Sequence, residues 1–160
     1  MLKVFKNLFF FFIASSALAQ QKIPNIVLKD LDSKEFSIQK DFEEKDKLYV
    51  FTFWATWCGP CIKELEEMNE IQEEWKQNLN FEIIAVSIDD TRTQKRVKPL
   101  VKGKEWTYKV LLDTNQDFKR AMGVVNPPFT MVVKNRKVVY IQNGYTPGSE
   151  QELYNKLKTL

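Results

Sequence analysis

Two nearly continuous apolar runs dominate the hydrophobic pattern, at residues 48–54 (LYVFTFW) and 81–88 (FEIIAVSI). Such runs are typical of strands that are buried on both faces of a sheet. The stretch between them, which ends near Trp75, repeats its apolar residues every three or four positions, as one face of a helix does. These residues are Cys61, Leu65, Met68, Ile71 and Trp75. A strand, a helix and a second strand of these lengths predict a right-handed βαβ crossover with parallel strands.

Shorter patterns predict the rest of a mixed sheet. Strands are expected at residues 25–31, 34–38 and 109–113, and as an antiparallel hairpin of residues 129–133 and 138–144. Helices are expected at residues 91–102, 117–122 and 150–160. Pro99 predicts an end or a kink in the first of these helices, and Ser149 with Glu152 predicts a capping box for the last. The sequence therefore predicts one α/β domain with a mixed central sheet, helices on both faces and an N-terminal β-hairpin extension.

The first 20 residues (MLKVFKNLFFFFIASSALAQ) have the layout of a secretory signal peptide. Two lysines precede an apolar run at residues 8–14, which is well short of the roughly 20 residues that span a bilayer. Ala17-Leu18-Ala19 fits a cleavage site. We expect residues 1–19 to be a cleaved signal, and residues 20–160 to be exported to the periplasm without a stable membrane span. An uncleaved segment that tethers the domain to the membrane is the alternative.

Charge and composition exclude several classes of function for this chain. The chain has a net charge of +3, and the residues after the first 20 include 22 basic and 21 acidic side chains. A nearly neutral domain lacks the strongly basic face of a nucleic-acid-binding protein. The chain contains no histidine, which excludes every catalytic or metal site that needs an imidazole. We therefore expect no nucleic-acid partner, no metal and no cofactor.

Both cysteines of the chain, Cys58 and Cys61, lie in the stretch FWATWCGPCIKE at residues 53–64. A disulfide stabilises a fold more when it closes a longer loop, and this four-residue loop is worth only roughly 2 kcal/mol before ring strain. A structural zinc site needs four ligands, of which the pair supplies two. Copper(I) can be held by two thiolates, so a copper carrier remains a second interpretation.

The position of the motif favours a redox-active dithiol. Cys58 follows a predicted buried strand and precedes a predicted helix, so its sulfur is expected at the helix N-terminus. Free N–H groups and the helix dipole favour a thiolate there, and the thiolate is the nucleophile of thiol–disulfide exchange. Pro60 suits the first turn of a helix. Cys61 lies one turn further on, near enough to attack a mixed disulfide formed on Cys58.

On these residues the chain resembles a thioredoxin-fold thiol–disulfide oxidoreductase of the exported TlpA/ResA-like branch. The resemblance rests on WATWCGPC at residues 54–61, Glu64 three residues later, LLDTN at 111–115, GVVNPPFTMVV at 123–133 and the signal peptide. It spans essentially all of the chain after the signal. It implies the thioredoxin fold, with its mixed sheet and two helical layers.

The resemblance also implies roles for individual residues. Cys58 is expected to attack a substrate disulfide and Cys61 to resolve the mixed disulfide, which leaves a Cys58–Cys61 disulfide in the oxidised state. Pro128 is expected to form a cis peptide bond opposite the dithiol, a minority state that a fold must enforce. The expected substrate-binding residues are Trp57, Gly59, Pro60, Pro127 and Pro128.

Two positions depart from the thioredoxin pattern. The residue before the cis-proline normally lends its N–H and C=O groups to an extended substrate, but Pro127 has no N–H. Thr52 stands where thioredoxin has a buried aspartate that transfers protons. Glu64 lies roughly 60° around the helix from Cys61. It is expected either to take over the proton transfer or to be a solvated residue of the helix surface.

Together these features predict an exported enzyme that exchanges its dithiol with the disulfides of protein substrates. The Gly-Pro dipeptide resembles that of reducing thioredoxins, so we expect a reductant. The resemblance implies a membrane electron donor that reduces the active site, and cytochrome c maturation is the familiar role of this branch. The alternatives are a copper(I)-binding or redox-sensing carrier without turnover, and an oxidant or isomerase.

Overall fold

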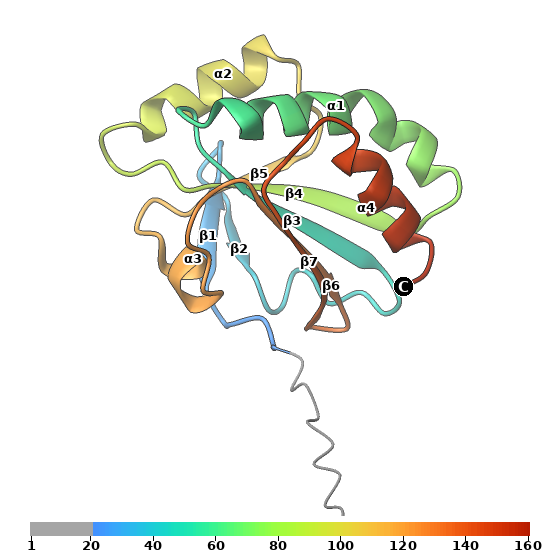
Figure 1. Ribbon diagram of the computed structural model, residues 1–160. Coiled ribbons are helices and arrows are strands. Elements are labelled where there is room, and N and C mark those ends of the chain that lie inside the picture. Colours follow the sequence, from blue (N-terminus) through green and yellow to red (C-terminus); the bar gives the residue numbers. More distant parts are fainter. Residues whose placement is uncertain (1–20) are drawn as a thin grey trace, which may run out of the picture.

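A computed structural model describes residues 21–160, and the predicted signal peptide at residues 1–19 lies outside them (Figure 1). The strands are β1 (Val27–Asp30), β2 (Glu35–Ser37), β3 (Leu48–Trp54), β4 (Phe81–Ser87), β5 (Lys109–Leu112), β6 (Phe129–Lys134) and β7 (Lys137–Asn143). The helices are α1 (Gly59–Lys76), α2 (Val97–Gly103), α3 (Asp117–Ala121) and α4 (Ser149–Leu157), with a 3₁₀ turn at Gln94–Arg96 before α2. The predicted strands are all present.

The strands form one mixed sheet in the order β2-β1-β5-β4-β3-β6-β7. β3, β4 and β5 are parallel, which confirms the predicted βαβ crossover. The β6–β7 hairpin is antiparallel and lies on the other side of β3, and Asn135 and Arg136 turn the chain with positive φ angles. The β1–β2 hairpin extends the sheet beyond β5. This order places β3, whose end leads into the cysteine motif, near the centre of the sheet.

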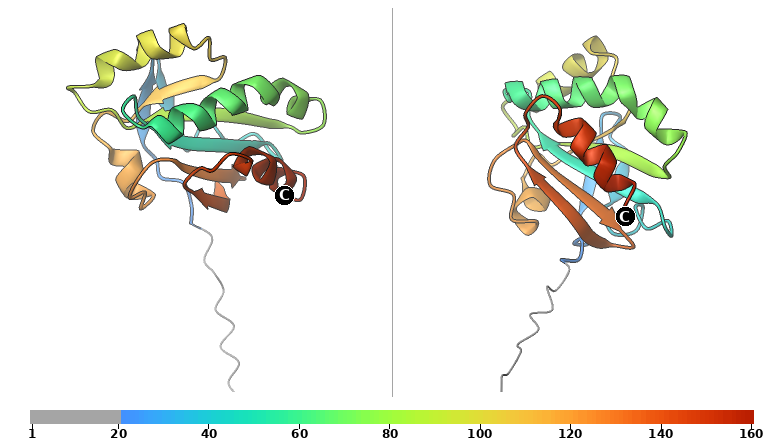
Figure 2. Two further views of the ribbon diagram at one scale, coloured as in Figure 1. Left: turned by 45° about the horizontal axis from the view of Figure 1, so that its top comes forward. Right: turned by 45° about the vertical axis from the view of Figure 1, so that its right-hand side comes forward.

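Helices cover both faces of the sheet, as predicted. α1, α2 and α4 lie on one face and α3 lies on the other (Figures 1 and 2). Side chains of β3 alternate between the two layers: Phe51 and Phe53 lie 5.6 and 5.2 Å from the Phe118 ring of α3. Trp54 packs instead against Trp106, with ring centroids 5.1 Å apart. All seven residues of β3 are buried, so packing fixes the position of its carboxyl end, from which the cysteine motif begins.

Two predictions for the helices on the α1 side were wrong in detail. Pro99 neither ends nor kinks a helix, because α2 begins only at Val97 and Pro99 lies in its first turn, where a missing N–H is tolerated. On α1, Ile71 is only partly buried, and Gln72 is buried in addition to the other predicted residues. The Gln72 amide donates to Asn69 and to Thr107, at 3.3 and 2.8 Å, so its burial leaves it hydrogen-bonded.

The predicted capping box of the last helix was also wrong. Gly148, with φ of 99°, is the N-cap of α4, and Ser149 is already helical. The Ser149 hydroxyl accepts a hydrogen bond from the Thr146 N–H at 3.0 Å. The carboxylate that accepts from the Gly148 N–H belongs to Glu150, not Glu152. The left-handed glycine brings the chain into the helix one residue earlier than the sequence pattern indicated.

Candidate active site

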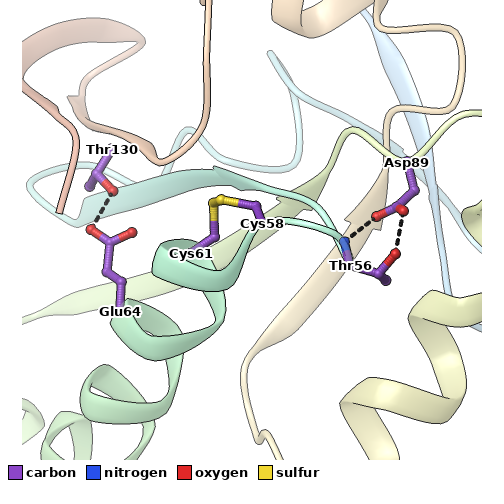
Figure 3. The surroundings of a disulfide bond; sticks show 6 residues. All are labelled: Thr56, Cys58, Cys61, Glu64, Asp89 and Thr130. Atoms are coloured by element: carbon purple, nitrogen blue, oxygen red, sulfur yellow. Dashed lines mark hydrogen bonds between the residues drawn. A yellow bond between two sulfur atoms is a disulfide. The ribbon is translucent and has the colours of Figure 1, made fainter.

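The cysteine pair lies at the junction of β3 and α1 (Figure 3). Cys58 is the N-cap of α1, with φ of −97° and ψ of 93°, and Cys61 lies within the first turn. Their sulfurs form a disulfide, with Cα atoms 5.3 Å apart. Cys58 is 7% exposed whereas Cys61 is 0% exposed. Cys58 is therefore the cysteine that a partner can reach.

The start of α1 favours negative charge on Cys58 once the disulfide is reduced. The first N–H groups of a helix have no partners within the helix, and the helix dipole is positive at this end. The first turn of α1 contains no acidic residue, and Pro60 lies where a helix needs no N–H. The free N–H groups, the helix dipole and the absence of an acidic side chain favour a thiolate, the form that attacks disulfides.

Glu64 is buried behind the first turn of α1. It is 1% exposed, and its Oε1 accepts a hydrogen bond from the Thr130 hydroxyl at 3.3 Å (Figure 3). The Thr130 hydroxyl lies 3.0 Å from that of Thr52 on the neighbouring strand. Burial raises the pKa of Glu64 to about 7; the Thr130 hydrogen bond opposes this rise and the charge of Glu150 adds to it. A solvated surface position for Glu64 is thereby excluded.

Further buried polar side chains lie on β7 and in the loop after it. Glu64 Oε2 has no hydrogen-bond partner among residues 21–160, and neither have the buried atoms Gln142 Nε2 and Tyr145 Oη. Thr130 pairs with Thr52 on one side and with Gln142 on the other, so these three residues form a row across β3, β6 and β7. Burial, followed by the charge of Glu150, raises the pKa of Tyr145 to about 12. Sequence reasoning identified only Thr52 and Glu64, because it gave no register between the strands.

The Pro127–Pro128 peptide bond is cis, the isomer that the resemblance implied for Pro128. Pro128 immediately precedes β6, which pairs with the end of β3, so this bond lies at the same end of the sheet as the cysteines. A pocket of about 360 Å³ beside it is lined in part by Pro127, Pro128 and Val125. Val125 is 75% exposed and Trp57 is 58% exposed. Apolar side chains at this end are thus free to contact another protein.

The predicted substrate-binding residues therefore lie on two segments. Trp57, Gly59 and Pro60 are exposed around the start of α1, and Pro127 and Pro128 lie in the loop before β6. The antiparallel pairing of β3 with β6 brings these segments to one end of the sheet. Their contacts with a substrate stay a prediction.

A second buried acid, Asp89, was missed by sequence reasoning. It is 1% exposed and accepts hydrogen bonds from the backbone N–H and the hydroxyl of Thr56, at 2.8 and 2.6 Å (Figure 3). Thr56 lies two residues before Cys58. The signal that could have indicated Asp89 is its position just after a buried strand, where a side chain can reach the neighbouring loop.

Within residues 21–160, no group of three or more cysteine, aspartate or glutamate side chains is arranged to hold a metal ion. No helix in the same part of the chain is both long enough and apolar enough to cross a membrane.

Comparisons with known proteins agree with this architecture. The family model described as Redoxin matches residues 18–157. Thiol-disulfide oxidoreductase ResA of Bacillus thuringiensis subsp. konkukian (strain 97-27) is 34% identical over 137 residues, which cover 85% of this chain and 76% of that protein. The solved structure of a thioredoxin-like protein from Porphyromonas gingivalis is 41% identical, with a TM-score of 0.75 over 86% of this chain and 90% of that one. The thioredoxin domain of a thiol-disulfide oxidoreductase from Bacteroides vulgatus, 23% identical with a TM-score of 0.70 over 89% and 98% of the two chains, shows the fold alone.

Proposed function

This chain belongs to the Redoxin family and is a thiol–disulfide oxidoreductase, and we propose that it reduces disulfides in exported proteins. The main support is the disulfide at the N-terminus of α1, with Cys58 accessible and Cys61 buried. In the reduced enzyme, the Cys58 thiolate attacks one sulfur of a substrate disulfide and releases the other as a thiolate. The Cys61 thiolate then attacks the Cys58 sulfur of the mixed disulfide. This step forms the Cys58–Cys61 disulfide and releases the second substrate thiolate, so two electrons pass from enzyme to substrate.

Glu64 moves the proton that this sequence requires. Cys61 is fully buried, so its thiol has to give its proton to a group inside the protein before the sulfur can attack. Glu64 lies one helical turn beyond Cys61, and its pKa of about 7 allows it to accept and return a proton near neutral pH. Thr52, which stands in place of the thioredoxin aspartate, keeps a supporting role through its hydroxyl contact with Thr130.

The substrate lies against side chains more than against the backbone. Pro127 has no N–H to donate to an extended peptide, which removes one of the backbone hydrogen bonds of β-strand addition. Trp57 is more than half exposed beside Cys58 and offers a large apolar contact. Gly59, Pro60 and Pro128 complete the surface around the disulfide.

The reaction takes place outside the cytoplasm. In this proposal residues 1–19 direct export and are cleaved, and residues 20–160 act in the periplasm as one thioredoxin-like domain. The described fold supports a boundary there, because Ile23, four residues after the proposed cleavage point, is already 2% exposed. Each turnover leaves the enzyme oxidised, so a membrane electron donor returns two electrons to the disulfide. Cytochrome c maturation, which reduces cysteine pairs in exported proteins, is the proposed setting.

The reduction potential of the Cys58–Cys61 pair tests the direction of exchange. We expect a value near that of thioredoxin, about −270 mV, and catalytic reduction of a protein disulfide when a dithiol recycles the enzyme. A value near that of DsbA, about −120 mV, would instead assign the protein as an oxidant. Cys58→Ser serves as the control that abolishes turnover. Stoichiometric copper(I) binding by wild-type protein that turns over no disulfide would contradict the proposal.

A further inference from the structure

The backbone ladder between β3 and β4 ends just before the loop that carries the cysteine motif. Its last hydrogen bond runs from the Ile88 N–H to the Trp54 carbonyl, at 2.8 Å. Beyond this bond the Asp89 side chain, one residue after Ile88, replaces the backbone as the link and reaches Thr56, two residues after Trp54. Its Oδ2 accepts from the Thr56 N–H and its Oδ1 accepts from the Thr56 hydroxyl. Both carboxylate oxygens therefore hold one residue of the loop (Figure 3).

Asp89 is itself held firmly at the end of β4. The Ser87 hydroxyl donates to Asp89 Oδ2 at 2.9 Å, and the Asp89 N–H donates to the same Ser87 hydroxyl oxygen at 3.2 Å. No lysine or arginine of residues 21–160 forms an ion pair with this 1% exposed carboxylate. Burying an unpaired carboxylate is unfavourable unless hydrogen bonds compensate for the lost water. Here the compensating bonds from outside its own segment all come from Thr56.

We propose that Asp89 is a positioning residue for thiol–disulfide exchange, which holds Thr56 and thereby fixes the direction in which the Cys58 sulfur faces. Thr56 is inside the turn that the Cys58 N–H closes on the Ala55 carbonyl, at 3.0 Å. Cys58, at the end of this turn, is also the N-cap of α1. Fixing the turn therefore aligns the sulfur with the free N–H groups of the helix and with the partner's approach. The inference rests on the proposed role of Cys58 as the attacking cysteine.

Alignment matters because exchange needs the attacking sulfur and the two substrate sulfurs close to one line. Displacing a reacting group by about 1 Å can cost about 100-fold in rate. If Asp89 acted only through its charge, its removal would lower the pKa of Cys58 and leave the rate constant of the thiolate unchanged, because a nearby carboxylate disfavours a thiolate. The other acids on the adjoining segments have partners of their own: Asp90 pairs with Arg92 at 2.6 Å, and Asp113 accepts the backbone N–H groups of Phe118 and Lys119.

The test compares Asp89→Ala, Thr56→Val and the double variant with wild-type protein. Thr56→Val removes the hydroxyl contact with Asp89 and keeps the backbone one, so it tests the link even where Asp89→Ala fails to fold. Asp113→Asn is the matched control, because Asp113 is also 1% exposed and accepts backbone N–H groups, but those of Phe118 and Lys119. The reaction of the reduced protein with a small disulfide, followed against pH, gives the pKa of Cys58 and the rate constant of its thiolate separately.

We expect the thiolate rate constant to fall about tenfold in Asp89→Ala and about threefold in Thr56→Val, within the range that misplacement costs. The double variant should be no slower than Asp89→Ala, because both changes break the same link. The control should keep the wild-type rate. An unchanged thiolate rate constant with a lowered Cys58 pKa, or additive losses, would overturn the proposal. If wild-type protein exchanged no disulfide, the proposed function would be wrong. The rate at which iodoacetamide alkylates Cys58 would then still compare the variants with wild-type protein.

Discussion

The Thr130 hydroxyl donates a hydrogen bond to Glu64 Oε1 across 3.3 Å, between residues 66 positions apart in the chain. This bond joins the helix that carries the cysteines to the strand that follows Pro128. It favours the ionised form of Glu64, whereas burial disfavours that form and has the larger effect. The proton affinity of this carboxylate therefore depends on its burial and on its contact with Thr130 of β6.

Thr130→Val should raise the pKa of Glu64 further above its ordinary value. Valine keeps the shape of threonine and removes the hydroxyl that stabilises the carboxylate. Carbon-13 NMR of the Glu64 carboxyl group during a pH titration of the oxidised protein measures the change. Thr114→Val, which removes a hydroxyl bonded to Gln94 instead, is the control. An unchanged Glu64 pKa would mean that the Thr130 bond has no influence.

Glu64→Gln should stabilise the protein increasingly as the pH rises. The folded protein binds the Glu64 proton with a pKa of about 7, against 4.5 for the free side chain. The contribution of Glu64 to the stability of wild-type protein is therefore fully present below pH 4.5 and is lost as the pH rises through about 7. The pKa shift corresponds to a contribution of up to about 3 kcal/mol to the free energy of unfolding. Wild-type protein loses this contribution at high pH, whereas the glutamine variant has no proton to lose. Urea unfolding at pH 4.5 and pH 8 measures the difference, and Glu70→Gln, an exposed position on the same helix, is the control.

The same Glu64→Gln variant should slow the resolving step of exchange. Without a group that accepts the Cys61 proton, we expect release of the second substrate thiol to fall about 100-fold, a typical contribution of general acid–base catalysis. The inflection near pH 7 in the pH–rate profile should disappear with it. Single-turnover measurements separate this step from the attack by Cys58. Equal rates in variant and wild-type protein would remove Glu64 from the mechanism.

Cys61→Ser should accumulate a mixed disulfide between Cys58 and the substrate, because no second sulfur is present to resolve it. Non-reducing electrophoresis and mass spectrometry of the adduct detect this species. Cys58→Ser should form no such adduct, because Cys61 is fully buried. Adducts on Cys61 would show that the proposed order of the two cysteines is wrong.

Trp57→Ala should weaken the reaction with protein disulfides and leave the reaction with a small disulfide nearly unchanged. Trp57 is 58% exposed, so its removal should change the free energy of unfolding by no more than about 0.5 kcal/mol. We expect kcat/KM for a protein substrate to fall about tenfold, as for a moderate contact residue. Ile141→Ala, at a 45% exposed apolar residue on β7, is the control and should change neither reaction.

The sequence by itself determined the local architecture around the cysteines. Continuous apolar runs identified β3 and β4, and the three-and-four spacing identified α1, because both signals depend only on which side chains a segment buries. The order of strand, CGPC motif and helix then placed Cys58 at a helix N-terminus. The sequence did not determine the helix ends: the predictions at Pro99 and Ser149 failed because capping depends on where the chain turns, as the positive φ of Gly148 shows.

Only the tertiary structure decided what surrounds the dithiol. The helical angle placed Glu64 near Cys61, but its burial depends on Thr130 and on the strands and helix that cover that side. Asp89 gave no sequence signal strong enough to identify its link to Thr56, 33 residues away. Hydrophobic periodicity reports which face of a segment is covered. It does not report which polar side chain from a distant segment meets that face, because strand register and helix packing set that contact.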